Sequence, residues 1–241
     1  MLGALCPLEP RLGKKLVEPL TNLITTTPAK SLLYEAIHTV SVGMTPHLSI
    51  VQLSMEKLKG FVEDEDQNLK YLGLLAMGNF MKVHPRVVAE HKSMILKCLN
   101  DEDITIRHRA LDLVSGMVSK KNLMDICRIL MEHVSTSEGS FRHDLVEKII
   151  EVCSKENYAC MTNFEWYIAT LCKLARMPGV CNGHHLRQQL MDVIIRVRAV
   201  RPYGVKMMVE LLRDSEMFSQ SSRDLSAAEV LCAAVTPTCE G

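Results

Sequence analysis

The sequence predicts an all-α protein built from stacked pairs of helices. Aromatic residues make up only 5% of the 241 residues, a composition that favours helices over sheets. Apolar residues recur with the helical period of about 3.6 residues, and the same apolar pattern returns along the chain. No stretch alternates strictly between apolar and polar residues and is bounded by hairpin turns, so we expect no strands.

The clearest copy of the pattern follows an acidic turn at residues 101–103. Its inward positions lie on one face of a helix, and they are Ile106, Ala110, Leu113, Val114 and Met117. The same spacing, 37 residues earlier and behind the acidic turn at 64–66, gives Leu69, Gly73, Ala76, Met77 and Phe80. Asp66 and Asp103 stand just before these helices, where a carboxylate can cap free N–H groups.

Three weaker copies complete the series. They start at residues 33, 145 and 186, and they comprise Leu33, Ile37 and Val40, then Leu145, Ile149, Val152 and Cys153, then Leu186, Leu190, Val193, Ile194 and Val197. Second helices are predicted between the copies, at 88–99, 123–131 and 163–175. Pro85 and Pro202 follow apolar helices and can occupy the first turn of the next one. A two-helix unit recurring about every 40 residues predicts a right-handed α-solenoid of HEAT- or armadillo-like repeats.

Charge and cysteine content exclude several classes of protein. The 28 basic and 28 acidic residues give a formal net charge of +0, which argues against nucleic-acid binding through a basic face. Nine cysteines are dispersed, and four of them lie in apolar stripes, which favours free thiols in a reducing cytoplasm; they are Cys98, Cys127, Cys153 and Cys172. We expect no targeting segment at the start of the chain and no membrane span, since the longest uncharged stretch, residues 36–55, is only about half apolar.

No candidate catalytic, cofactor or metal site emerges from the motifs. Cys181 and His184 have a zinc-like spacing, but there is no second close pair of ligands, and Gly179, Asn182 and Gly183 indicate a loop. The acidic residues at 64–66 and 101–103 are interpreted as exposed turns between helices, and not as a metal-binding or acid/base cluster, because the same turn occurs twice. The sequence contains no nucleophile elbow and no phosphate loop. We therefore predict a protein that is not an enzyme and that needs no cofactor.

A close glycine pair, Gly73 and Gly78, lies within a helical pattern and is interpreted as close packing of helices. The basic residues at 14–15 and 120–121 read as solvated faces, and the group Arg196, Arg198 and Arg201 retains an alternative as a phosphate contact.

The only Trp lies in an aromatic cluster that has two readings. Trp166 and Tyr167 are adjacent on a predicted helix. They are either a binding hot spot or large side chains that fill the core between two repeats. The sequence leaves the binding residues unknown.

Several segments resemble adaptins, the large subunits of clathrin-type adaptor complexes. The resemblance lies in residues 5–12, in the run Asn-Leu-Lys-Tyr-Leu-Gly-Leu within 66–74, in 109–113 with Ser-Lys-Lys-Asn-Leu within 118–124, and in Asn-Phe-Glu-Trp-Tyr within 162–168. It extends from near residue 2 to about residue 232. The resemblance implies a trunk fragment at 1–232, of about five to six helix pairs, followed by a disordered or truncated tail at 233–241.

The resemblance also implies a function. An adaptin is a scaffold within a heterotetramer with beta, mu and sigma chains, which carries cargo in vesicles from Golgi or endosomal membranes toward lysosomes and related organelles. We expect a cytoplasmic protein that associates peripherally with those membranes through the complex, without nucleic acid or a small-molecule substrate. The alternatives are another HEAT-repeat scaffold, such as a transport receptor or a phosphatase scaffold, and a helical-repeat enzyme acting on DNA.

Overall fold

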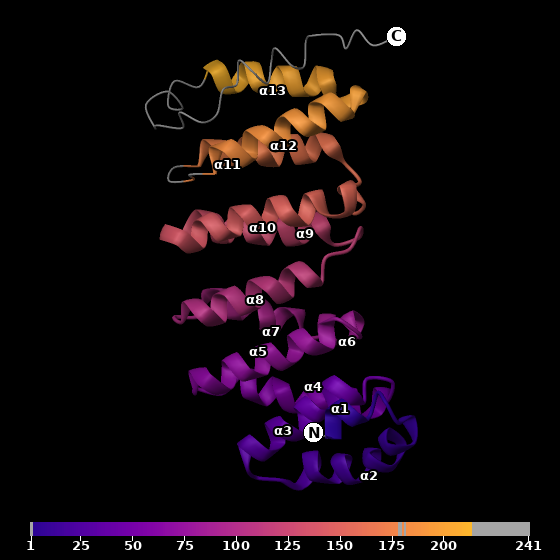
Figure 1. The fold of residues 1–241 in the computed structure, drawn as a ribbon. Coiled ribbons are helices and arrows are strands. Elements are labelled where there is room, and N and C mark those ends of the chain that lie inside the picture. The colour runs from indigo at the N-terminus through magenta and orange to yellow at the C-terminus, as the bar shows by residue number, and fades with distance from the viewer. Residues whose placement is uncertain (1, 178–179, 181, 214–241) are drawn as a thin grey trace. The chain divides into compact units, whose positions relative to one another are not determined.

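The structure, a computed structural model, describes residues 2–177, 180 and 182–213. It divides into two compact units, Met1–Met117 and Val118–Gly241, and each is described by itself. Over the described residues every regular element is helical (Figure 1), in agreement with the predicted all-α class. The predicted tail at 233–241 lies outside the described residues.

The first unit begins with two helices that support the first copy of the repeat. α1 (Leu2–Leu5) packs against α3 (Lys30–Gly43), and α2 (Pro10–Thr26) packs against α3 and α4 (Leu48–Val62). The α1–α3 approach is close at Gly43, where a Cβ would collide with the Gly3 carbonyl. Residues 38–48 contain the end of α3 and the start of α4.

The remaining helices of the first unit repeat this pairing. α5 (Gln67–Met81) packs on α4 and on α8 (Ile104–Gly116), so that α3, α5 and α8 form successive inner helices. The inward residues predicted on α8 are all buried, from Ile106 to Met117. On α5, Gly73 and Phe80 are buried and Leu69 is half-buried, which confirms the predicted face.

One predicted helix of the first unit is divided. The sequence predicts a single helix at 88–99, whereas the structure has α6 (Pro85–Ala89), α7 (Lys92–Lys97) and the 3-10 helix η1 (Cys98–Asn100). Pro85 occupies the first turn of α6, as expected. The turn at Glu90 and His91 interrupts the helix, and its side chains line a groove instead of the core.

The second unit continues the same pattern of paired helices. α9 (Leu123–Thr136) packs on α10 (Gly139–Tyr158), and α11 (Phe164–Arg176) packs on α12 (Gly183–Arg196) and α13 (Arg201–Arg213), which follows the 3-10 helix η2 (Arg198–Val200). The inward residues predicted on α10 and α12 are buried apart from Val197, which is half-buried. The stripes therefore form the core of this unit, and Cys127, Cys153 and Cys172 lie in it as free thiols.

The end of α10 departs from helical geometry in a way the sequence does not predict. Glu156, Asn157 and Tyr158 all have positive φ, at 51°, 58° and 64°. Asparagine tolerates this left-handed region, but Glu and Tyr seldom adopt it. Such a turn persists only where its surroundings hold it in place.

Candidate functional site

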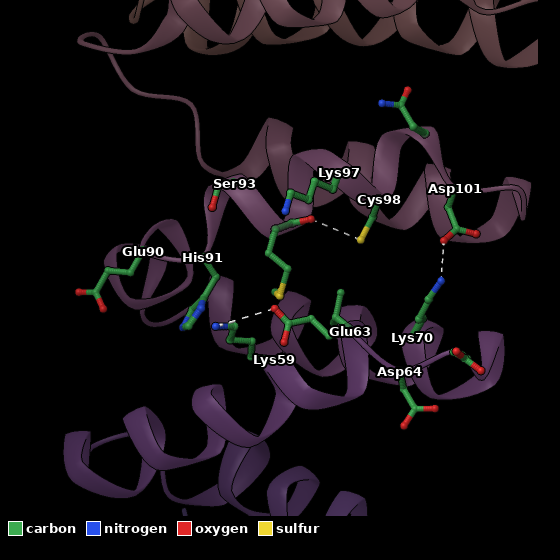
Figure 2. A pocket seen from close by; sticks show the side chains of 14 residues that line it. Lys59, Glu63, Asp64, Lys70, Glu90, His91, Ser93, Lys97, Cys98 and Asp101 are labelled. Atoms are coloured by element: carbon green, nitrogen blue, oxygen red, sulfur yellow. Dashed lines mark hydrogen bonds and ion pairs between the residues drawn. The ribbon is translucent and has the colours of Figure 1, made fainter.

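The first unit contains a polar groove between the α4–α5 turn and the α6–η1 segment (Figure 2). We call it the acidic-turn groove, because both acidic turns found in the sequence contribute to it. Its volume is about 670 Å³. Its lining residues are Lys59, Val62, Glu63, Asp64, Glu65, Lys70, Glu90, His91, Ser93, Met94, Lys97, Cys98, Asn100 and Asp101.

The two acidic turns have the same internal geometry. In the first, Asp64 Oδ1 accepts a hydrogen bond from the Asp66 N–H at 3.1 Å, and Asp66 Oδ1 accepts one from the Asn68 N–H at 2.8 Å. The second turn repeats both bonds, from the Asp103 N–H to Asp101 Oδ1 at 3.1 Å and from the Thr105 N–H to Asp103 Oδ1 at 2.7 Å. The predicted caps at α5 and α8 are thereby confirmed.

The first aspartate of each turn also joins neighbouring repeats. Lys30 at the start of α3 lies 2.6 Å from Asp64 Oδ2, and Lys70 on α5 lies 3.0 Å from Asp101 Oδ2. The hydrogen bond from Lys30, followed by that from the Asp66 N–H, lowers the pKa of the Asp64 carboxyl. These carboxylates are therefore held in turns and ion pairs, which supports the reading of the acidic clusters as structural.

The other lining groups do not form a catalytic arrangement among the described residues. The Cys98 thiol donates to the Met94 carbonyl at 3.5 Å, and burial raises its pKa, so the thiol stays protonated and is a poor nucleophile. Lys59 lies 3.8 Å from Glu63 along α4. Basic and acidic groups alternate around the groove, as Figure 2 shows. These groups are suited to the binding of charged ligands.

The zinc-like pair of the sequence lies only partly within the described residues. His184 is exposed, and Cys181 lies outside the described residues. No group of three or more His, Cys, Asp or Glu side chains among the described residues is arranged to hold a metal ion. The neighbouring His185 instead contacts Glu147 Oε1, at 3.2 Å from its Nδ1.

The paired glycines of α5 prove to be different from one another. A Cβ at Gly73 would lie 2.9 Å from Val62 Cγ2 and 3.1 Å from Phe61 Cβ, which is too close for ordinary packing. At Gly78 the nearest atom would be Leu113 Cδ2, at 3.9 Å, an ordinary contact. Close helix packing therefore explains Gly73 and does not explain Gly78.

The basic group near the end of α12 is partly used within the fold. Arg196 pairs with Asp192 at 2.6 Å and donates to Asn157 Oδ1 at 2.9 Å. Arg201 donates to the carbonyls of Ile194 and Ile195, which are free at the end of the helix. Arg196 and Arg201 therefore serve the packing of α12, which weakens the alternative of a phosphate contact.

The aromatic pair is divided between the two readings. Tyr167 is fully buried, and its hydroxyl donates to Gln189 Oε1 at 3.3 Å. Trp166 is half-exposed and lines a second groove, between α9 and α11. Tyr167 is thus a core residue, whereas the exposed Trp166 keeps the hot-spot interpretation open.

The polar network around the left-handed turn was missed in the sequence. The Tyr158 hydroxyl donates to Asp192 Oδ2 at 2.7 Å and to Gln189 Oε1 at 3.0 Å. Burial, followed by the bond to Asp192, raises the pKa of Tyr158. The Tyr158 ring also meets Phe164 edge to face at 5.7 Å. Only Asn157, a residue that tolerates positive φ, hinted at this turn in the sequence.

One helix pair carries a further polar join. His143 Nδ1 on α10 lies 2.8 Å from Asn182 Oδ1 at the start of α12, and the Asn182 side chain is buried. His143 Nε2 lies 3.3 Å from Glu147 Oε1. These contacts hold α10 and α12 in register.

Among the described residues, no helix has both the length and the apolar character needed to cross a membrane.

Comparison with known proteins identifies the class. The family model of the adaptin N-terminal region matches residues 1–234, and the chain belongs to this family of adaptor-complex large subunits. Within the family it resembles delta-adaptin, the large subunit of adaptor protein complex 3, in the segments quoted above. It is 51% identical to AP-3 complex subunit delta-1 of Bos taurus, and 48% identical to AP-3 complex subunit delta of Dictyostelium discoideum.

The similarity covers most of this chain and little of its relatives. Each of these two alignments spans 97% of this chain and 20% of the relative, so the chain has about a fifth of their length. A homology model of the full-length AP-3 complex in an intermediate open conformation matches 90% of this chain and 42% of one of its chains, with a TM-score of 0.64 and 24% identity. This match supports the predicted solenoid fold.

Proposed function

We propose that the chain is a non-enzymatic scaffold segment of a delta-type large subunit in a heterotetrameric clathrin-type adaptor complex. The match of the adaptin N-terminal region over residues 1–234 carries the proposal. The similarity to delta subunits of AP-3 complexes from an animal and an amoeba supports the particular subunit. The family boundary also supports a single trunk segment at about 1–232, which stays a prediction.

The physical character of the chain supports a scaffold. Its buried side chains are the apolar stripes of successive helices, and its acidic turns and tyrosine hydroxyls join one repeat to the next. Helical repeats of this kind present extended surfaces to protein partners. The partners proposed are the beta, mu and sigma chains of the complex, and the process is vesicle-mediated transport of proteins from Golgi or endosomal membranes toward lysosomes and lysosome-related organelles.

The location follows from the same assignment. We propose that the chain works on the cytoplasmic side of Golgi or endosomal membranes, and that the assembled complex provides the peripheral membrane contact. No cofactor, nucleic acid or small-molecule substrate is part of this role.

Co-expression tests the proposal directly. The tagged chain is produced together with the beta, mu and sigma chains of an AP-3 complex and is purified through its tag. We expect at least one of the three chains to copurify in stoichiometric amount, whereas a tagged HEAT-repeat protein from outside the adaptin family should retain none. If the chain has the helical circular dichroism of a folded protein and still elutes alone, the scaffold assignment is wrong.

A further inference from the structure

A groove lies between α9 and α11 in the second unit. Its volume is about 720 Å³. We call it the Trp166 groove. Its lining includes Met124, Met131 and Glu132 from α9, and Trp166, Thr170 and Lys173 from α11. α11 packs closely on α13 but less closely on α9, which leaves this opening between neighbouring helices.

The two walls of the groove are helical stripes of the same length. On α9 the lining residues run from Met124 to Ser135, and along α11 and its C-terminal cap they run from Trp166 to Met177. Each wall therefore covers about three turns, or roughly 16 Å at 1.5 Å per residue. Three turns of a partner helix would match the length of both walls.

Trp166 gives the groove an apolar anchor with a polar handle. Its main chain is fixed, because its N–H donates to Asn163 Oδ1 at 3.0 Å and its carbonyl accepts from Thr170 Oγ1 at 2.8 Å. The indole is half-exposed, and its N–H has no hydrogen-bond partner among the described residues. Met124, which lines the same groove, is 39% exposed. Exposed Trp and Met side chains of this kind are typical of adaptable binding surfaces.

The charges on the walls are complementary to a two-sided ligand. Asp125 and Arg128 lie 3.7 Å apart on α9 and largely neutralise each other. Within the described part of the chain, Glu132 on α9 and Lys173 on α11 have no ion-pair partner. One wall therefore keeps a negative charge and the other a positive charge.

We propose that the Trp166 groove binds an amphipathic helix from another protein. The helix would span about three turns, place Leu-, Ile- or Met-type residues on Trp166 and the methionines, and carry a basic residue toward Glu132 and an acidic residue toward Lys173. A helix suits the groove better than an extended strand, because the backbone N–H and C=O groups of α9 and α11 are paired within those helices and cannot form a β-ladder.

Selection from a peptide library tests this inference with the intact chain. The library displays helical peptides of about fourteen residues, with apolar residues at helical spacing and Lys, Glu or Ser on both edges. Trp166 is the only Trp of the chain, so binding at the groove is read directly from its fluorescence. We expect the selected peptides to shift the Trp emission to shorter wavelength and to protect it from acrylamide, each in a saturable manner. Scrambled peptides of the same composition should do neither.

Matched variants locate the site. Trp166→Ala should weaken binding of a labelled peptide at least about tenfold, whereas Tyr203→Ala, at a half-exposed aromatic residue on α13, should leave it unchanged. Lys173→Glu should weaken it about three- to tenfold, and Lys121→Glu, at an exposed lysine outside the groove, should not.

A charge-exchanged peptide distinguishes the loss of a direct contact from a folding defect in the variants. A peptide with its two charged edges exchanged should recover affinity for the double variant Glu132→Lys, Lys173→Glu. Enriched peptides that are rich in proline or that alternate with a period of two would overturn the helical ligand. Binders that leave the Trp166 emission unchanged, or no binders at all, would overturn the groove as a docking site.

Discussion

The two units join their neighbouring repeats by different polar contacts. In the first unit, ion pairs link a lysine of one repeat to the acidic turn of the next, as between Lys30 and Asp64. In the second unit, neighbouring repeats are joined mainly by hydrogen bonds of aromatic and amide side chains, such as Tyr158 with Asp192 and His143 with Asn182. Each unit also has one contact of the other kind: Arg109 donates to the Tyr71 hydroxyl in the first unit, and His185 contacts Glu147 in the second. The apolar stripes beneath both kinds of join are alike and are largely buried.

The difference teaches which part of the repeat carries its stability. The Lys30–Asp64 pair is exposed on the lysine side, with 56% of that side chain accessible, and exposed ion pairs contribute about 0–1 kcal/mol and weaken in salt. The part-buried bond from the Tyr158 hydroxyl to a carboxylate is worth about 1.5–3 kcal/mol. Burial of the apolar stripes should contribute more to the free energy of unfolding than either kind of polar contact. The polar contacts should be what distinguishes the two units.

The largest expected effect tests the stripe that both units share. Leu113→Ala in the first unit and Leu145→Ala in the second should each lower the free energy of unfolding by about 2–5 kcal/mol, since both side chains are buried. Asp112→Ala, at an exposed position on the same helix as Leu113, should cost little. Urea unfolding followed by circular dichroism measures all three, and equal midpoints for Leu113→Ala and Asp112→Ala would contradict the helix face.

A second comparison concerns the close approach that the first unit makes at Gly73. Gly73→Ala should destabilise by about 1–3 kcal/mol, because the new methyl group must displace Val62 and Phe61. Gly78→Ala, five residues along the same helix, should stabilise by up to about 1 kcal/mol because alanine favours the helix. Thermal unfolding of the two variants should therefore give shifts of opposite sign.

The polar joins themselves are compared by Tyr158→Phe and Lys30→Met. The first should cost about 1–3 kcal/mol, because Asp192 and Gln189 lose a donor. The second should cost less than about 1 kcal/mol, and the difference from the unchanged chain should vanish in about 1 M salt. Urea midpoints at low and high salt measure both, and a strongly salt-dependent effect of Tyr158→Phe would remove the distinction between the units.

The smallest effects concern stability at the extremes of pH. The acidic turns of the first unit should lose their contribution to stability in acid, whereas Tyr158 of the second unit should lose its contribution in base. Asp64 and Asp103 have pKa values lowered from 3.8, first by their bonds to Lys30 and Thr105 respectively. Their contribution is therefore present above pH 3.8 and is lost as the pH falls through the lowered values. The pKa of Tyr158 is raised from 10.0 by burial and by Asp192, so its contribution is complete below pH 10 and is lost as the pH rises further.

Melting temperatures across the two pH ranges check this pattern. Asp64→Asn and Asp103→Asn should flatten the fall in stability below about pH 4, and asparagine keeps the capping oxygen. Tyr158→Phe should reduce the fall above about pH 10 without abolishing it, because burial also raises the pKa of Tyr167 and, to about 12, that of Cys172. If the melting temperature falls below about pH 4 as steeply in both asparagine variants as in the unchanged chain, the acidic turns do not distinguish the first unit.

The sequence by itself determined the features that depend on local chemistry. The helical period located the inward face of α8 and α10, the aspartates before α5 and α8 marked their caps, and Pro85 marked the start of α6. The acidic turns and the adaptin segments could be recognised for the same reason. A period, a cap or a motif depends only on residues that are close together in the sequence.

The tertiary structure decided what depends on neighbours distant in the chain. Adjacent aromatic residues on α11 look alike in the sequence, yet Tyr167 is buried against Gln189 whereas Trp166 faces the groove beside α9. The left-handed turn at 156–158 exists alongside bonds from Asn157 and Tyr158 to α12, more than thirty residues away. Exposure, strain and grooves are set by the elements that pack around a residue, and a local pattern carries no record of them.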